Sequence, residues 1–311
     1  MSFKLWFAAA VIVAISAPQS APRLPLRSRV DAFVRAHEQA FIEIRRDIHR
    51  HPELSGREER TAKIVADRLR ALGLDVRSGV GGHGVAAILK GGRPGPLVAY
   101  RADMDAVVSN ATDPAPFPSV IAGVRHICGH DVHVAIGLGL AETLASVRAD
   151  LPGRVMFVFQ PAEERATGAR AMIADGLFAA GRPIAVFGLH SSPLEAGRLT
   201  SKAGVMMYSN AIAPGVTNDA ALFARARRSL IDAFGPDAFV DLNAPPAGFS
   251  EDFGEYQKLT PGVFFFIGLS NTPKGIRAMP HDANFNVDES AIPFGIRAMA
   301  AVLIDEASRK P

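Results

Sequence analysis

The stretch that decides the fold is residues 155–164, "VMFVFQPAEE", in which five apolar residues run into a glutamine, a proline and two glutamates. A short, continuously apolar run is typical of a strand that is buried on both faces of a sheet. In an open α/β sheet, ligand-binding side chains gather at the carboxyl ends of such strands. Glu163 and Glu164 are therefore candidates for a functional site. The simpler alternative is that they begin a solvated helix, whose dipole favours acidic residues there.

Other apolar runs of the same kind alternate with segments of helical periodicity. Further strands are expected over residues 85–89, 97–100, 184–189 and 263–269. Helices are expected over residues 30–48, 134–147, 167–174, 219–234, 251–259 and 289–307, and from a capping box at 55–58 to residue 72, with Asn218 capping the helix at 219. This alternation predicts one α/β domain with a mixed, mainly parallel sheet and helices on both faces.

The overall composition excludes some classes of function. The 311 residues are 48% hydrophobic and 21% charged, with a net charge of only +3, which is typical of a globular protein with a sizeable core. Basic residues are dispersed among acidic ones and are not interleaved with aromatic residues. We therefore expect no nucleic-acid partner.

The N-terminus has the pattern of an export signal. Lys4 precedes an apolar run over residues 5–17, which is shorter than the ~20 residues of a membrane span. This order predicts a secretory signal peptide over residues 1–21, cleaved after Ser16 or near Ala21, and a periplasmic or secreted protein without a stable membrane span. A buried N-terminal helix is disfavoured by the prolines at 18, 22 and 25. A membrane-anchored interaction protein is the alternative if the run stays uncleaved.

Candidate metal ligands recur at the predicted strand ends, and Cys128 and His130 are expected in the loop that enters the predicted helix 134–147. The segment 125–133, "RHICGHDVH", holds three of the nine histidines and the only cysteine. An exported chain with one cysteine forms no internal disulfide, so this residue is buried, reactive or metal-bound. The candidates are Asp103, Asp105, Cys128, His130, Glu163, Glu164, His190 and His281. Thiolate, imidazole and carboxylate groups from separate loops predict an open, catalytic transition-metal site.

Each candidate also has a simpler interpretation. A single cysteine is more often a small core residue, and a histidine after an apolar strand is often a hydrogen-bonded core residue. His126 and His133 are interpreted in this structural way. Taken together, the candidates favour a metal site, because a separate structural explanation would otherwise be needed for each of them at several strand ends.

Seven segments carry a resemblance to a known family. They are, in chain order, "IRRDIHRHPELSGREERT", "RADMDA", "CGHDVH", "QPAEE", "GLH", "SEDFGEY" and "PHDANFNVDE". From about residue 40 to residue 307 the chain resembles the hippurate hydrolase and N-acyl-amino-acid amidohydrolase branch of the aminoacylase/carboxypeptidase superfamily of dinuclear metallopeptidases. The resemblance implies a single zinc-peptidase-like domain over residues 22–311.

The resemblance also implies roles for individual residues. The implied ligands of two divalent ions (zinc, manganese, nickel or cobalt) are Cys128, His130, Glu164, His190 and His281. Glu163 would be the general base, and Asp105, Asp103 and His133 would orient ligands from behind. Such a site cleaves the amide bond of N-acyl amino acids or small peptides with a metal-activated water.

One departure from the family concerns its inserted lid and dimerisation domain, on the order of a hundred residues. Only residues 208–216 lie between the flanking matches, so this insertion is expected to be missing and the protein to be a monomer. The family's lid supplies a histidine to the oxyanion, and losing one such donor costs ~2.7–4 kcal/mol. An arginine is one possible replacement, whereas His83 is not assigned the role. The alternative function is a weak or inactive relative that binds metal or an acylated ligand.

Overall fold

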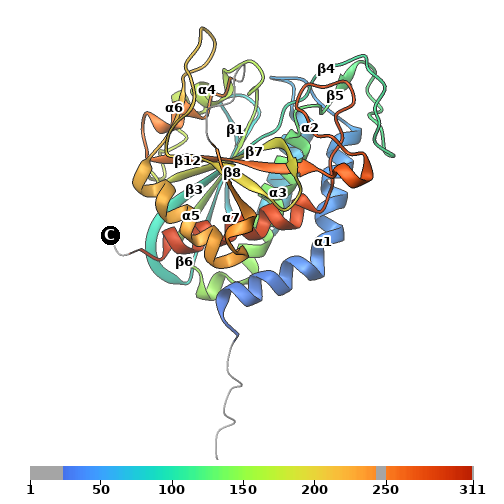
Figure 1. Cartoon of the computed structure of the whole chain (residues 1–311). Coiled ribbons are helices and arrows are strands. Elements are labelled where there is room, and N and C mark those ends of the chain that lie inside the picture. Colours follow the sequence, from blue (N-terminus) through green and yellow to red (C-terminus); the bar gives the residue numbers. More distant parts are fainter. Residues whose placement is uncertain (1–23, 243–249, 310–311) are drawn as a thin grey trace, which may run out of the picture.

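An eight-stranded sheet forms the centre of the computed structural model, which describes residues 24–242 and 250–309 (Figure 1). The predicted signal peptide over residues 1–21 lies outside the described residues. The strand order is β1-β2-β6-β3-β7-β12-β8-β11. The bounds are β1 (Asp75–Val80), β2 (Gly84–Lys90), β3 (Arg93–Asp103), β6 (Pro152–Gln160), β7 (Val186–Glu195), β8 (Leu199–Ser201), β11 (Phe239–Asp241) and β12 (Gly262–Ser270).

The four central strands are parallel. β6 pairs with β3, β3 with β7, and β7 with β12, all in the parallel sense. β8 and β11 are also parallel, whereas β1–β2, β2–β6 and β12–β8 are antiparallel. This confirms the predicted mixed, mainly parallel sheet. It also places the carboxyl ends of β6, β3, β7 and β12 at one edge.

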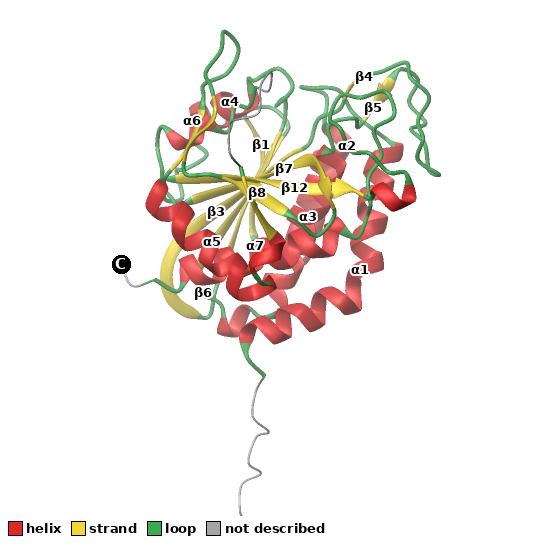
Figure 2. Cartoon of the chain, viewed as in Figure 1, coloured by secondary structure: helices red, strands yellow, loops and turns green. Residues whose placement is uncertain are grey.

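Helices cover both faces of the sheet (Figure 2). One face packs against α1 (Leu26–Arg50), α2 (Glu59–Ala71), α3 (His130–Ser146), α5 (Ala220–Phe234) and α7 (Ala291–Ala307), and the other against α4 (Gly168–Ala174) and α6 (Gly254–Gln257). Alternate residues of β2 enter the two cores, with Val85 in one and Ala86 in the other. α3 lies against α1, α7 and the sheet, and is buried almost all round. None of the described helices is long and apolar enough to cross a membrane.

Several short elements were not predicted. The hairpins β4 (Val107–Val108) with β5 (Val124–Arg125), and β9 (Gly204–Met207) with β10 (Val216–Asn218), lie outside the main sheet. The short 3₁₀ helices span Arg148–Asp150, Pro236–Ala238 and Thr272–Lys274. Edge elements of two to four residues carry too little periodicity to be recognised in a sequence.

Two predicted helix caps are wrong. α2 begins at Glu59 without a side-chain cap, and the Ser55 hydroxyl instead donates to Asp105 at 2.6 Å. The cap of α5 is Asp219, which accepts from the backbone N–H of Leu222 at 2.7 Å. In both cases a tertiary hydrogen bond, invisible in the local sequence, engages the side chain that the cap rules select.

Asn218 joins three segments instead of capping a helix. Its amide donates to Ser201 at 2.9 Å and to the Lys202 carbonyl at 2.8 Å, and its oxygen accepts from the Phe264 backbone at 2.8 Å. We expect Asn218→Ala to lower the free energy of unfolding by about 2–3 kcal/mol, because it leaves buried backbone groups unpaired. Asp219→Ala should cost only ~1 kcal/mol, as a lost cap does. Urea unfolding of both variants measures the difference, and the opposite order would contradict this assignment.

Candidate metal centre

A polar cavity of about 380 Å³ opens at the carboxyl edge of the central strands. The residues that line it are Cys128, Glu163, Glu164, His190, Ser250, Pro280 and His281. Five of the eight candidates predicted from the sequence therefore lie at the wall of one cavity. The first and the last of them, Cys128 and His281, are more than 150 positions apart in the chain. The other three, Asp103, Asp105 and His130, are buried directly behind the wall.

Gly129 fixes how Cys128 and His130 leave the backbone. It is the N-cap of α3 and has φ +87°, a left-handed conformation that favours glycine. A Cβ at this position would lie 3.0 Å from Cβ of Ser191, so a larger residue would also be crowded. His130 is the first residue of α3, and not part of a loop before the helix as the sequence predicted.

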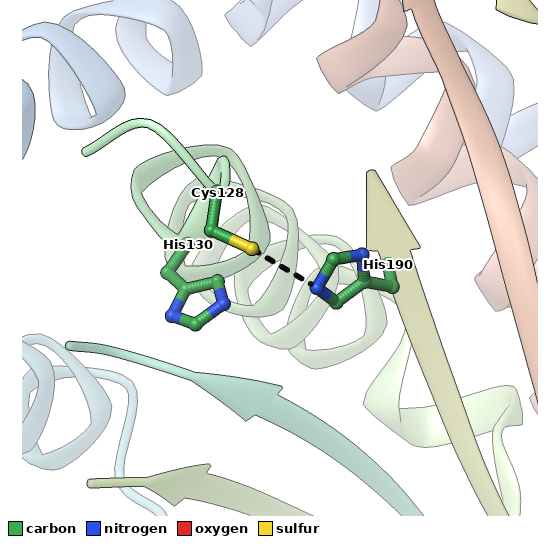
Figure 3. A group of neighbouring side chains, drawn as sticks. All are labelled: Cys128, His130 and His190. Atoms are coloured by element: carbon green, nitrogen blue, oxygen red, sulfur yellow. Dashed lines mark hydrogen bonds between the residues drawn. The ribbon is translucent and has the colours of Figure 1, made fainter. Parts of the chain in front are cut away.

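His190 faces Cys128 in a defined tautomer. Its Nε2 lies 3.4 Å from the Cys128 sulfur (Figure 3). Its Nδ1 lies 3.0 Å from the Ser191 carbonyl, which can only accept, so Nδ1 carries the proton. The Nε2 lone pair therefore points towards the sulfur. His190 lies within β7, because that strand extends beyond the predicted end at residue 189.

His130 is fixed in the same way by Asp105. Its Nδ1 lies 3.2 Å from Oδ1 of that carboxylate, and its buried Nε2 has no hydrogen-bond partner among the described residues. Nε2 lies 3.8 Å from one carboxylate oxygen each of Glu163 and Glu164, too far for a hydrogen bond. An imidazole held from behind with an unpartnered nitrogen in front is the arrangement of a metal ligand.

A tight turn after β6 presents the two glutamates. Ala162 has φ +52°, which costs free energy for a residue with a Cβ. Its backbone N–H donates to the buried Glu58 carboxylate at 2.9 Å, which holds the turn. The Glu164 N–H donates to Asp105 at 3.0 Å. No described residue donates a hydrogen bond to the Glu163 carboxylate, which faces the cavity.

His281 completes the far wall. Its backbone also has a positive φ, +65°, and its N–H donates to the Ile127 carbonyl at 2.7 Å, next to Cys128. Its Nε2 lies 3.4 Å from Oε2 of Glu164. Strained backbone at both Ala162 and His281 is consistent with a site whose geometry the surrounding structure enforces.

His133 supports the site without facing the cavity. Its Nε2 accepts from the Ser191 N–H at 2.9 Å, and its Nδ1 contacts Asp103. Both ring nitrogens are therefore engaged and none is left for a metal. His133 and Asp103 thus contact each other behind the cavity, and their role in orienting ligands stays a prediction. His126 is buried with both ring nitrogens unpartnered, and burial lowers its pKa to about 4.

A buried ionic cluster behind the cavity was missed by the sequence analysis. The Arg101 guanidinium donates to Glu251 at 2.8 Å, to Asp252 at 3.1 Å and to Asp103. Gln160 accepts from Arg101 at 2.9 Å and donates to Asp252 at 2.7 Å. Arg101 and Asp103 stand two residues apart on β3, on one face of a strand that is otherwise apolar, and this is the signal that could have revealed the cluster.

Burial sets the pKa values of the cavity groups. It raises the pKa of the Cys128 thiol and lowers that of His190. Burial, and then the Glu251 carboxylate, raise the pKa of Glu163. These shifts keep the imidazole lone pair free, whereas a thiolate at Cys128 requires a positive charge nearby.

The pKa of His130 moves the other way. Burial opposes its charged form, but Asp103, Cys128 and the hydrogen bond to Asp105 raise its pKa well above the usual value. The same negative field attracts a divalent cation, which would compete with the proton for Nε2.

Two sets of ligand atoms share the cysteine. One set is Cys128, His130 and His190, and the other is Cys128, Glu164 and His281, each with its ligand atoms within 4.8 Å of one another. Other groups of neighbouring donors among the described residues do not include the cysteine, such as Asp103, His130 and His133, or His130, Glu163 and Glu164.

Residues 99–305 match the peptidase family M20/M25/M40. The chain belongs to this family. The match begins in β3 and ends in α7, so it includes every cavity residue described above.

Individual relatives agree with this. The chain is 42% identical to thermostable carboxypeptidase 2 of Saccharolobus solfataricus over 178 residues, covering 56% of this chain and 45% of the relative. It is 40% identical to a Campylobacter jejuni hippurate hydrolase over 171 residues, covering 55% of this chain and 44% of the relative. The matches thus span less than half the length of these curated relatives.

A solved structure supports the fold over a longer range. The Bacillus subtilis YXEP protein, described as a dinuclear metal binding peptidase, superimposes with a TM-score of 0.77 at 25% identity. The superposition covers 88% of this chain and 99% of that protein.

Gly129→Ala tests the crowding at the cavity. Gly197 provides a matched control, because its φ is +85° and a Cβ there would meet nothing within 4 Å. Both substitutions should lower the free energy of unfolding by about 1–2 kcal/mol through the left-handed backbone. Gly129→Ala should cost at least ~1 kcal/mol more, because of the contact with Ser191. Equal losses in urea unfolding would show that the contact is relieved without cost.

Proposed function

We propose that this protein is a metal-dependent hydrolase that cleaves the amide bond of N-acyl amino acids or small peptides. The observation that carries the proposal is the convergence of Cys128, His130 and His190, with each imidazole held at Nδ1 by an acceptor so that Nε2 is the nitrogen turned towards the other donors. Family membership supports the hydrolase class, and the names of the relatives include both a carboxypeptidase and a hippurate hydrolase.

The donor set fits two divalent metal ions of the transition series. Cys128, His130 and His190 would hold one, and Glu164 and His281, again with Cys128, the other. When bound, such ions supply positive charge that acidifies a water and polarises the scissile carbonyl. Asp105 and the Ser191 carbonyl orient the two buried imidazoles through their Nδ1 protons. Zinc, manganese, nickel and cobalt are all compatible with these donors.

Glu163 is assigned the proton transfers. Its carboxylate faces the cavity and is buried, and its raised pKa suits a group that takes and returns a proton near neutral pH. In the proposed reaction the water oxygen bonds to the carbonyl carbon, Glu163 accepts the water proton, and the C–N bond breaks. The leaving nitrogen then takes that proton, which yields a carboxylic acid and a free amine.

The proposed enzyme acts without an inserted lid, because residues 208–215 alone connect β9 to β10, and these strands pair with each other. No arginine lines the cavity among the described residues, so the arginine considered as an oxyanion donor is not found there. Ser250 contributes a hydroxyl donor to the wall. Export and a monomeric state stay predictions of the sequence.

Glu163→Gln tests the proposed base. The variant should keep its metal content and lose on the order of 10²–10⁴-fold in kcat on N-acetyl and N-benzoyl amino acids. Glu43→Gln, at an exposed position on α1, should leave kcat unchanged. Metal bound by the wild type with no turnover of any substrate would favour the alternative, a relative that binds metal or an acylated ligand without hydrolysis.

Two ligand substitutions test the shared role of Cys128. His281→Ala should reduce the bound zinc from two ions to about one per chain, because His281 belongs to one ligand set only. Cys128→Ser should weaken both ions, because Cys128 belongs to both sets. Equilibrium dialysis followed by elemental analysis gives the stoichiometry. Retention of two ions by the serine variant would contradict the shared assignment.

A further inference from the structure

The loop over residues 51–58, "HPELSGRE", joins α1 to α2 and also reaches the candidate metal centre. The backbone carbonyl of Glu53 accepts from the backbone N–H of Ala106 at 2.8 Å, which anchors the loop just beyond the end of β3. Two side chains of the loop, those of Ser55 and Glu58, are buried, and neither lines the cavity. Their hydrogen bonds show what the loop does for the site.

Glu58 holds the residue that precedes Glu163. Its Oε1 accepts from the backbone N–H of Gly56 at 2.8 Å and from that of Ala162 at 2.9 Å. The contact with Gly56 folds the loop back on itself and so fixes the carboxyl group. The contact with Ala162 crosses to the turn after β6, where the positive φ of Ala162 costs free energy. An acceptor that lies 104 positions away in the chain thus stabilises a strained turn.

Ser55 holds the residue that follows Glu163, through the carboxylate of Asp105. The Ser55 hydroxyl donates to Oδ2 of Asp105 at 2.6 Å. The same oxygen accepts from the backbone N–H of Glu164 at 3.0 Å, and Oδ1 faces Nδ1 of His130. Ser55 therefore fixes the rotation of a carboxylate whose two oxygens both support the site.

The two backbone N–H groups that flank Glu163 are thus both held from one loop. Glu58 accepts from the group before it, and the Asp105 carboxylate that Ser55 fixes accepts from the group after it. The Glu163 carboxylate itself has no donor among the described residues, so its place in the cavity depends on the backbone that carries it. A side chain that reacts needs such support, because small displacements take it out of the productive geometry.

We propose that Glu58 and Ser55 are positioning residues for Glu163, and that they set where its carboxylate lies relative to the metal centre. This inference rests on the proposed hydrolase function, in which Glu163 transfers the proton. Displacing a reacting group by about 1 Å can cost on the order of 10²-fold in rate. Since neither Glu58 nor Ser55 lines the cavity, the loss should appear in kcat and not in KM.

Two substitutions of Glu58 separate its hydrogen bonds from its charge. Glu58→Ala removes the acceptor, and in the full, zinc-loaded chain it should lower kcat on N-benzoylglycine by about 10- to 100-fold. KM and the zinc content should stay within about twofold of the wild type. Glu58→Gln keeps a carbonyl oxygen in the place of Oε1 and should retain kcat within about threefold. An equal loss in both variants would contradict positioning through these hydrogen bonds.

Glu53→Ala is the matched control from the same loop. The Glu53 carboxylate accepts from the backbone N–H groups of Arg60 and Thr61, at 2.9 and 2.8 Å, in the first turn of α2. Its loss should lower stability against urea and leave kcat unchanged. Ser55→Ala removes a single hydrogen bond and should lower kcat by about tenfold. If Glu53→Ala lowered kcat as far as Glu58→Ala, the loop would have only a general structural role and the inference would be overturned.

A double variant shows whether Glu58 acts through Glu163. Adding Glu58→Ala to Glu163→Gln should change the residual kcat by less than about twofold, because the group that Glu58 positions has already been removed. A further loss as large as that in the single variant would show that Glu58 acts on another part of the site, which would also overturn the inference.

Hydrogen exchange separates this inference from the proposed function. Mass spectrometry of a peptide that covers residues 161–168 follows the amides of Ala162 and Glu164. Glu58→Ala should speed their exchange by about tenfold, whereas Glu58→Gln and Glu53→Ala should not. If no substrate is hydrolysed but this pattern holds, the hydrolase proposal fails and the positioning of the turn stands. If substrate is hydrolysed and Glu58→Ala keeps the wild-type kcat or the wild-type exchange, the positioning role is overturned.

Discussion

The parallel pairing of β6, β3, β7 and β12 is the constraint on which the rest of the molecule depends. Because these strands run in one direction, the chain leaves each of them at the same edge of the sheet. Segments that are distant in sequence then contribute to one cavity. Both faces of such a sheet must be covered, which explains why its strands are apolar almost throughout and why helices pack on either side.

The polar groups at this buried edge create a second requirement. Each of them needs a hydrogen-bond or ion-pair partner, or a role at the cavity. Arg101 is neutralised by three carboxylates, and the Nδ1 protons of His130 and His190 are each held by an acceptor. Two groups are left without such partners among the described residues: His130 Nε2, directly behind the cavity wall, and the Glu163 carboxylate, which faces the cavity. The hydrogen-bond partners of the buried polar groups thus distinguish the side chains that support the site from those that are left without a partner.

The same sheet that positions the metal ligands also extends past them. The row of paired residues His190, Phe266, Thr200 and Val240 changes from an imidazole at the cavity to an aromatic ring within one strand spacing. A polar cavity and an apolar surface are therefore built from neighbouring positions of one register.

Periodicity and residue type in the sequence by themselves determined the fold class and five of the seven residues that line the cavity, because apolar strands followed by carboxylates, imidazoles and a thiol are local patterns. They did not determine the tertiary hydrogen bonds of Ser55 and Asn218, the position of His130 in the first turn of α3, or the cluster around Arg101. Each of these depends on a partner far away in the chain. The order of strands in the sheet decided the row that reaches Val240, since cross-strand neighbours exist only after the register is set.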